Sequence, residues 1–300
     1  MYFKNITLFL ISVLLLSSCA MSKTFHRPQP LDRSIADYAY FTSGKDTTLI
    51  RYHQSTHHID LLRPDSSLIN QDYSIQNSYF ESSSGNRLNL WVMTPKSGEI
   101  KATILHFHGS AANLINQYQA IAPLLDYGYQ VFSFDYSGYG FSEGKASRKN
   151  VLADAYAALS HVYGHERSKS EILLLYGQSY GGYLAAVVGA NSQDKIDGLI
   201  IEGAFSTHKA EARYTVPIVG NVVKNEAKAH VEIRTNRKPL LVIHSREDKR
   251  VPIKFGRKIF ENAKEPKTFY EIDQKHIAGL QFYAEEIAAK IDQLLSGTGR

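Results

Sequence analysis

The stretch EILLLYGQSYGGYLAAVVGA, residues 171–190, decides the fold of this chain. Its first part is an apolar run short enough for a buried strand, and its last part is rich in alanine and other small residues, which predicts a helix. Between them lies GQSYG, residues 177–181, which has the form G-x-S-x-G. In this context the motif predicts a tight, strained turn that exposes the Ser179 hydroxyl at the N-terminus of the helix.

The chain on both sides of this stretch alternates apolar runs with helical spacing. Runs typical of buried strands also cover residues 102–107, 129–135, 196–201, 240–244 and 268–272. Helices are expected at residues 114–126, 150–162 (with Asn150 as the N-cap), 253–263 and 277–295. Residues 74–80 and 88–94 alternate partly in polarity and suit an antiparallel edge. This order predicts the α/β class, with a mostly parallel eight-stranded sheet flanked by helices in one domain, residues 73–300.

Polar residues follow several of these strands, at the edge where parallel sheets place their function. A serine hydroxyl needs a base, and the base needs a carboxylate to orient it. Asp248 lies in the loop after the strand at 240–244, and His276 follows the strand at 268–272. We therefore predict Ser179 as nucleophile, His276 as base and Asp248 as the orienting acid. Glu247 is the rival acid, and the spacing to residues 251–252 favours Asp248.

An oxyanion that forms on the attacked group needs hydrogen-bond donors. Tyr180 N–H is one candidate, and the loop after residues 102–107 supplies the other. There we expect Ser110 N–H, with Ala111 as a possible substitute. His106 and His108 lie on that strand or at its end and precede the acid, so we interpret both as structural.

These segments resemble the α/β-hydrolase superfamily, and more closely its Bem46-like group and its serine-aminopeptidase-type (S33) domain. The resemblance covers about residues 75–295 and rests on FHGSAAN (107–113), FDYSGYGFSEG (134–144), GQSYGG (177–182), IIEGAFST (200–207), HSREDKRVP (244–252) and KHIAG (275–279). It implies the α/β-hydrolase fold and assigns the family's catalytic and oxyanion roles to Ser179, Asp248, His276, Ser110 and Tyr180.

Three features depart from the family: residues 20–72 have no counterpart in it, and two motif positions differ. Ser110 stands where Asn is common, and Tyr180 stands where Leu or Met is common. Both changes leave the backbone amides in place. The cap of this fold falls between Glu202 and Pro239, and residues 204–238 are too few for a large cap domain. We therefore predict a small cap or none, and an open site.

The N-terminus, MYFKNITLFLISVLLLSSCA, predicts a targeting segment. Lys4 precedes an apolar run that is short for a membrane span and fits a signal peptide. Residues 16–19, LSSC, resemble the lipobox of bacterial lipoproteins. This resemblance implies a signal peptide over 1–18, lipidation of Cys19, and a tether with an N-terminal extension over 19–72. A plain secretory signal or an uncleaved anchor is the alternative. The expected location is the bacterial cell envelope, outside the cytoplasm. In a Gram-negative source the outer membrane is favoured, because the residue after Cys19 is Ala20 and not an Asp.

Composition excludes several classes of protein. Of the 300 residues, 43% are hydrophobic and 21% charged, which argues against disorder and a multi-span membrane protein. The single cysteine excludes an internal disulfide and Cys-based metal sites. No long Lys/Arg block accompanies the net charge of +5, so we expect no nucleic acid partner. His53, His57 and His58 allow a metal site, but a solvated strand or loop is the favoured interpretation.

The residues together favour a membrane-anchored serine hydrolase that cleaves an acyl ester or thioester of a small molecule or lipid. No metal or organic cofactor is expected, and the oligomeric state stays open. An acyltransferase or a peptidase with the same three residues is the alternative within catalysis. A non-catalytic envelope lipoprotein on a hydrolase scaffold is the alternative outside it.

Overall fold

The computed structural model of the chain describes residues 25–32, 38–43, 46–53, 55–166, 171–220 and 222–296. The predicted signal peptide and Cys19 lie outside these residues. Within them, no helix combines the length and apolar character needed to cross a bilayer.

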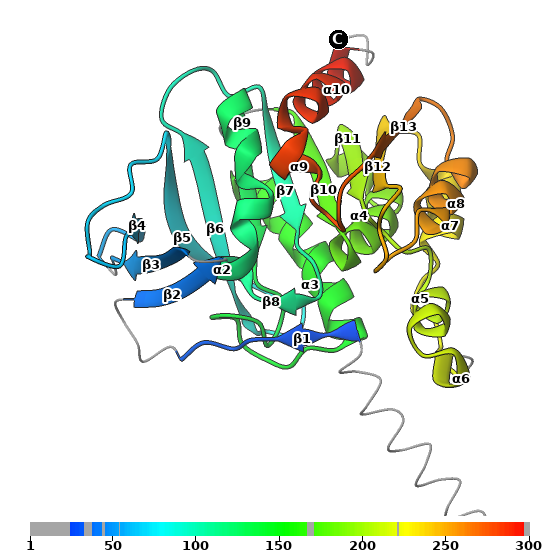
Figure 1. Cartoon of the computed structure of the whole chain (residues 1–300), viewed down its shortest axis with the longest axis horizontal. Helices are drawn as coiled ribbons and strands as arrows, with labels where there is room; N and C mark the ends of the chain where they lie inside the picture. Colours follow the sequence, from blue (N-terminus) through cyan, green and yellow to red (C-terminus); the bar gives the residue numbers. More distant parts are fainter. Residues whose placement is uncertain are drawn as a thin grey trace, which may run out of the picture.

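One large twisted sheet forms the centre of the molecule (Figure 1). Its strands lie in the order β13 (Lys267–Ile272), β12 (Leu240–Ser245), β11 (Gly198–Glu202), β10 (Leu173–Gln178), β7 (Ala102–Phe107), β9 (Tyr129–Phe134), β6 (Arg87–Pro95), β5 (Tyr73–Glu81), β4 (His58–Leu62), β3 (Asp46–Tyr52), β2 (Tyr38–Ser43). Neighbours from β13 to β9 pair in parallel, and those from β9 to β2 pair antiparallel. The eight strands predicted from residue 73 onward are all present in this sheet.

The N-terminal extension, predicted over residues 19–72, contributes β2, β3 and β4, which extend the sheet beyond β5 and were not predicted. Among the described residues the sheet therefore has eleven strands, and β5 is not its edge. β4 joins β5 through a register of only two residue pairs, His58 with Gln76 and Ile59 with Ile75. Residues 38–62 contain no clear alternation of apolar and polar residues, so the sequence did not mark these strands.

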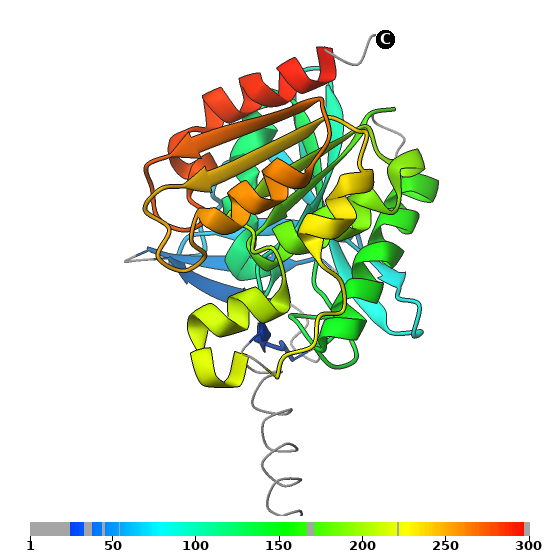
Figure 2. The ribbon, with the colours of Figure 1, turned by 90° about the vertical axis from the view of Figure 1, so that its right-hand side faces the viewer.

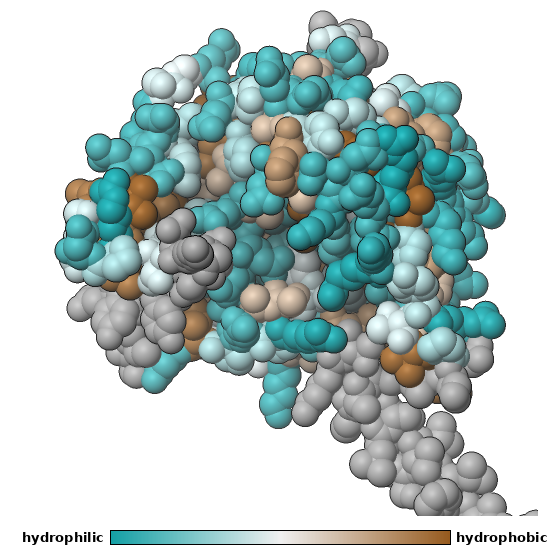
Figure 3. All heavy atoms as spheres, viewed as in Figure 1, coloured by the Kyte–Doolittle hydropathy of each residue, from teal (hydrophilic) through white to brown (hydrophobic). Residues whose placement is uncertain are grey.

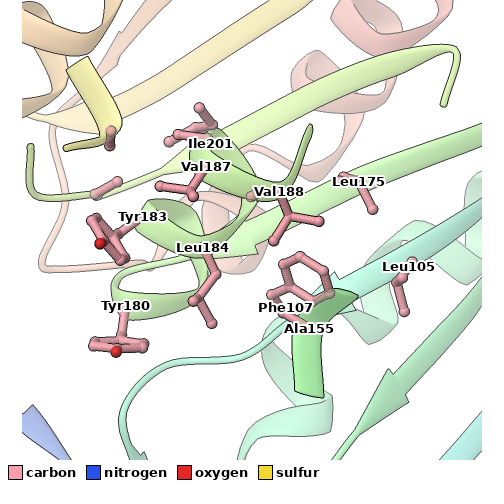
Figure 4. Close-up of a cluster of buried hydrophobic side chains, with 14 of the residues drawn as sticks. Leu105, Phe107, Ala155, Leu175, Tyr180, Tyr183, Leu184, Val187, Val188 and Ile201 are labelled. Carbon is pink, nitrogen blue, oxygen red and sulfur yellow. The ribbon is translucent and has the colours of Figure 1, made fainter. Parts of the chain in front are cut away.

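Helices cover both faces of the sheet (Figure 2). One face packs against α3 (Arg148–His161), α4 (Tyr180–Ala190), α7 (Ala229–Glu232) and α8 (Lys254–Asn262). The other packs against α2 (Leu114–Gln117), α9 (Gly279–Phe282) and α10 (Ala284–Ser296). Successive strand residues point to opposite faces, so that Leu105 and Leu175 join the first core while Ile104 and Leu174 join the second. Figure 4 shows α4 residues such as Leu184 and Val188 in the first core.

Three helix predictions require correction. Residues 114–127 form α2 and two 3-10 helices, because Pro123 cannot continue a regular helix. Ser147 rather than Asn150 is the N-cap of α3, and its side chain accepts the Asn150 N–H. The closing helix is divided into α9 and α10 at Tyr283.

The region expected to form a small cap contains short helices. After β11 come α5 (His208–Thr215) and α6 (Pro217–Gly220), followed by α7 and a 3-10 helix at Ile233–Thr235. α5 and α6 project from the body of the molecule (Figures 1 and 2).

Candidate active site

Ser179 occupies a sharp turn between β10 and α4. Its φ of 56° and ψ of −115° put a non-glycine residue in a strained conformation. The Ser179 N–H donates to the Glu202 carbonyl at 2.8 Å, which ties the turn to the end of β11. The strain predicted from the G-x-S-x-G motif is therefore present, and the turn is held by the neighbouring strand.

Two glycines allow this turn to form. A Cβ on Gly181 would collide with the carbonyl oxygen of Phe107, at the end of β7. A Cβ on Gly177 would collide with the carbonyl oxygen of Gly181. Because neither glycine carries a side chain, α4 can begin directly behind the ends of β7 and β10.

The structure brings the three predicted side chains into one chain of hydrogen bonds. The His276 Nε2 lies 2.8 Å from the Ser179 Oγ. On the other side of the ring, the His276 Nδ1 lies 2.6 Å from the Asp248 Oδ2. With the proton on Nδ1, His276 donates to Asp248 and accepts from Ser179, the arrangement required of a general base.

The environment of Asp248 favours its ionised form. Burial alone would raise the pKa of this carboxyl. The hydrogen bond and the charge of His276 and the Val251 N–H outweigh burial, and the pKa lies below its ordinary value. The Oδ1 accepts the N–H groups of Arg250 at 2.9 Å and Val251 at 2.8 Å. The rival Glu247 is exposed, and the structure places Asp248, not Glu247, on His276.

The loop after β7 lies beside Ser179. A Cβ built on Gly109 would be 3.8 Å from the Ser179 Cβ. Tyr180 is the first residue of α4, so its N–H has no acceptor within the helix. Both predicted oxyanion donors thus lie on segments that border the nucleophile, and their donor role stays a prediction.

An N-terminal strap, residues 25–31, holds this loop, and the sequence did not indicate it. Its strand β1 (Arg27–Pro28) pairs in parallel with β8 (Ala111–Ala112). The Ser110 carbonyl accepts the Arg27 N–H at 2.9 Å and the Tyr139 hydroxyl at 2.8 Å. The His26 ring contacts the Tyr139 hydroxyl, 3.0 Å from its Nδ1. Two donors, one from the strap and one from Tyr139, therefore hold the Ser110 carbonyl oxygen in place.

Glu202 is a second feature that the sequence analysis did not assign. Its buried carboxylate accepts from Tyr176 OH at 2.9 Å, Gln178 Nε2 at 2.7 Å and Gly279 N–H at 2.8 Å. Burial raises its pKa, although these hydrogen bonds and the charge of His276 act in the opposite direction. Glu202 thereby connects the turn that carries Ser179 with the loop that carries His276. An acidic residue at the end of an apolar run, Ile200-Ile201-Glu202, was the available signal.

Four other histidines, singled out from the sequence, have structural surroundings. His106 bonds Ser133 and Gln178, and burial with the neighbouring His108 lowers its pKa to about 3. Burial also lowers the pKa of His108 to about 4. His53 and His58 both pair with Asp60. Among the described residues, no group of three or more His, Cys, Asp or Glu side chains is arranged to hold a metal ion.

Comparisons with known proteins identify the family. A profile of the serine aminopeptidase (S33) family matches residues 98–234. The protein YfhR of Escherichia coli K12 is 30% identical over 221 residues, which span 71% of this chain and 78% of YfhR. This chain belongs to the α/β-hydrolase family of these proteins. The protein bem46 of Schizosaccharomyces pombe is 29% identical over 171 residues, 54% of this chain and 56% of bem46.

Solved structures agree on the fold. The esterase Pf2001 of Pyrococcus furiosus superposes with a TM-score of 0.63 and 17% identity, over 75% of this chain and 91% of the esterase. Est1E of Butyrivibrio proteoclasticus superposes with a TM-score of 0.60 and 15% identity, over 73% of this chain and 99% of Est1E. The predicted fold and family are confirmed. Membership of this family supports the prediction that the protein is a hydrolase.

Proposed function

We propose that this α/β hydrolase is a serine hydrolase that cleaves an acyl ester or thioester through an acyl-enzyme on Ser179. The observation that carries the proposal is the continuous hydrogen-bond chain from the Ser179 Oγ through His276 to Asp248. A serine on a strained turn with such a chain behind it has the arrangement of an activated nucleophile.

In the proposed reaction the Ser179 Oγ attacks the acyl carbonyl carbon while His276 Nε2 takes the hydroxyl proton. Asp248 stabilises the resulting imidazolium and keeps its orientation. The oxyanion accepts hydrogen bonds from the N–H groups of Tyr180 and Ser110. Its collapse expels the alcohol or thiol, which takes the proton from His276. Water, deprotonated by His276, then attacks the acyl-enzyme. The bond between the Ser179 Oγ and the acyl carbon breaks, His276 returns its proton to the Oγ, and the carboxylic acid leaves.

The ester or thioester substrate class follows from the leaving group. Alkoxide and thiolate groups leave more easily than an amine, which must first be protonated. Glu211 of α5 is mostly buried, and burial together with the charge of Asp248 raises its pKa to about 7. A carboxyl that is ionised only in part near pH 7 is a weaker partner for the charged amine of a peptide N-terminus than a fully ionised one.

We also propose that the enzyme is a lipoprotein of the bacterial envelope, anchored through a lipidated Cys19. The support is the LSSC sequence directly after an apolar run, together with the position of the sole cysteine of the chain at that point. Several acyl chains on one terminus hold a protein durably at a membrane, whereas a single chain binds only marginally.

Turnover of p-nitrophenyl esters from acetate to palmitate, and of the matching thioesters, tests the activity. The parent enzyme is expected to hydrolyse some of these esters, and Ser179→Ala to lose about a thousandfold or more of its kcat. Ser110→Ala serves as the matched control, because it removes a hydroxyl but keeps the proposed oxyanion N–H. A folded parent enzyme without turnover, or an active Ser179→Ala variant, refutes the proposal.

A further inference from the structure

The surface of α5 and α6 next to the site combines apolar and cationic side chains. Tyr214, Val216 and Val222 are 43%, 41% and 57% exposed. Cationic side chains are exposed around them, namely Arg213, Lys224, Lys249 and Lys254. We call these seven residues the cap face. Figure 3 shows hydrophobic and hydrophilic side chains beside one another in this part of the molecule.

Contacts link Tyr214 of the cap face to Lys249 and Lys254. The Tyr214 hydroxyl donates to the Lys249 carbonyl at 2.9 Å. The Lys254 Nζ lies 5.9 Å from the centre of the Tyr214 ring. At the other side, Arg148 donates to the Lys224 carbonyl at 2.6 Å. The face therefore extends from α5 to the loop that carries Asp248, at the border of the candidate active site.

The charge of this surface is predominantly positive. Of the acidic side chains nearby, Glu226 pairs with Arg148 at 3.4 Å. Glu211 is mostly buried, and burial raises its pKa to about 7. Glu247, two residues before Lys249, adds one exposed carboxylate to a region with four exposed cations. Such a surface complements the negative charge of an anionic bilayer.

The N-terminal strap enters the fold beside the same surface. The Phe25 ring lies edge-on to His208 of α5 at 5.0 Å, and the Arg148 guanidinium lies 5.7 Å from the Phe25 ring centre. Cys19 precedes Phe25 by six residues, which reach about 20 Å at full extension. A lipid on Cys19 would therefore hold α5 within about 20 Å of the bilayer surface.

We infer that the cap face docks on the anionic lipid bilayer that holds the Cys19 anchor and that the enzyme takes its acyl substrate from that bilayer. This inference rests on the proposed function and deepens it by naming a membrane lipid ester as the substrate class. The apolar side chains enter the headgroup region and the lysines and arginine meet anionic lipids. The short anchor and the strap keep the active site over the membrane.

Fluorescence of the anchored full-length protein tests the docking. Val222→Cys is labelled with an environment-sensitive fluorophore and reconstituted through its anchor into phosphatidylcholine vesicles, with and without phosphatidylglycerol. Leu68→Cys is the matched control, because Leu68 is also 57% exposed but lies after β4. We expect a blue shift at position 222 that grows with phosphatidylglycerol, and none at 68. No shift at 222, or equal shifts at both positions, overturns the inference.

Turnover separates this inference from the proposed function. The double variant Val216→Asp, Val222→Asp is compared with the parent on a fluorogenic ester lipid in the vesicle and on soluble p-nitrophenyl acetate. We expect a loss of about tenfold or more on the ester lipid and unchanged turnover of the acetate. Equal turnover of the ester lipid by the variant and the parent overturns the docking. A parent inactive on both esters instead refutes the proposed function, while the fluorescence still reports on docking.

Discussion

Asp248→Asn removes one negative charge from the site and changes the hydrogen-bonding pattern of His276. The Oδ1 of Asp248 accepts two backbone N–H groups, those of Arg250 and Val251. An asparagine must keep its oxygen there, because its NH2 group would face two donors. The NH2 group then occupies the position of Oδ2 and points at the His276 Nδ1, 2.6 Å away in the parent.

This exchange reverses the proton positions on His276. Facing a donor, the Nδ1 must accept, and the proton moves to Nε2, which then points at the Ser179 Oγ. The ring can no longer take the serine proton. Loss of the correct tautomer in a triad lowers kcat by about 10⁴-fold, or about 5.5 kcal/mol in the barrier.

The assay is steady-state hydrolysis of a soluble p-nitrophenyl ester, with the fold checked by thermal unfolding. Glu247→Gln is the matched control, because it makes the same chemical change on the exposed neighbouring side chain. We expect its kcat to stay within about twofold of the parent value. The reasoning is refuted if folded Asp248→Asn keeps more than about a tenth of the parent kcat, or if Glu247→Gln loses more than Asp248→Asn.

Three further predictions follow from the surroundings of the site. Burial raises the pKa of Asp154 to about 6, so stability falls as pH rises between about 4 and 6. Asp154→Asn should therefore gain about 3 kcal/mol over the parent in urea unfolding at about pH 8, and nothing at about pH 4. Arg27→Pro deletes the N–H that holds the Ser110 carbonyl and should lower kcat about tenfold. Arg27→Ala keeps this N–H and should keep the parent kcat, so equal kcat values for the two variants would contradict the prediction. Glu202→Gln places an NH2 group either against the Gly279 N–H or against the donors of Tyr176 and Gln178. The variant should lose about 1–3 kcal/mol of unfolding free energy in urea, and its kcat should fall as well. Unchanged stability would disprove that role of Glu202.

The central sheet and the meeting of Ser179, His276 and Asp248 were predictable because their signals are local. The apolar runs, the glycines around Ser179 and the loops after the last strands each lie within a few residues. The choice of Asp248 over Glu247 also rested on local spacing, and the structure agrees with it.

The strap and Glu202 were not predictable, because their roles arise from distant contacts. The Arg27 N–H reaches Ser110, and the Gly279 N–H reaches Glu202. No periodicity marks a two-residue strand such as β1, which exists through its pairing with β8. Pro123 indicates that residues 114–127 are divided into more than one helix. In contrast, strands β2, β3 and β4 belong to the sheet only because β4 pairs with β5.

Fluorophosphonate labelling followed by mass spectrometry shows directly whether Ser179 is an activated nucleophile. We expect one phosphonate per chain, on Ser179, and no adduct in Ser179→Ala or His276→Ala under the same conditions. An adduct on another residue, or no adduct on the folded parent protein, would contradict the assignment of Ser179 as the activated nucleophile.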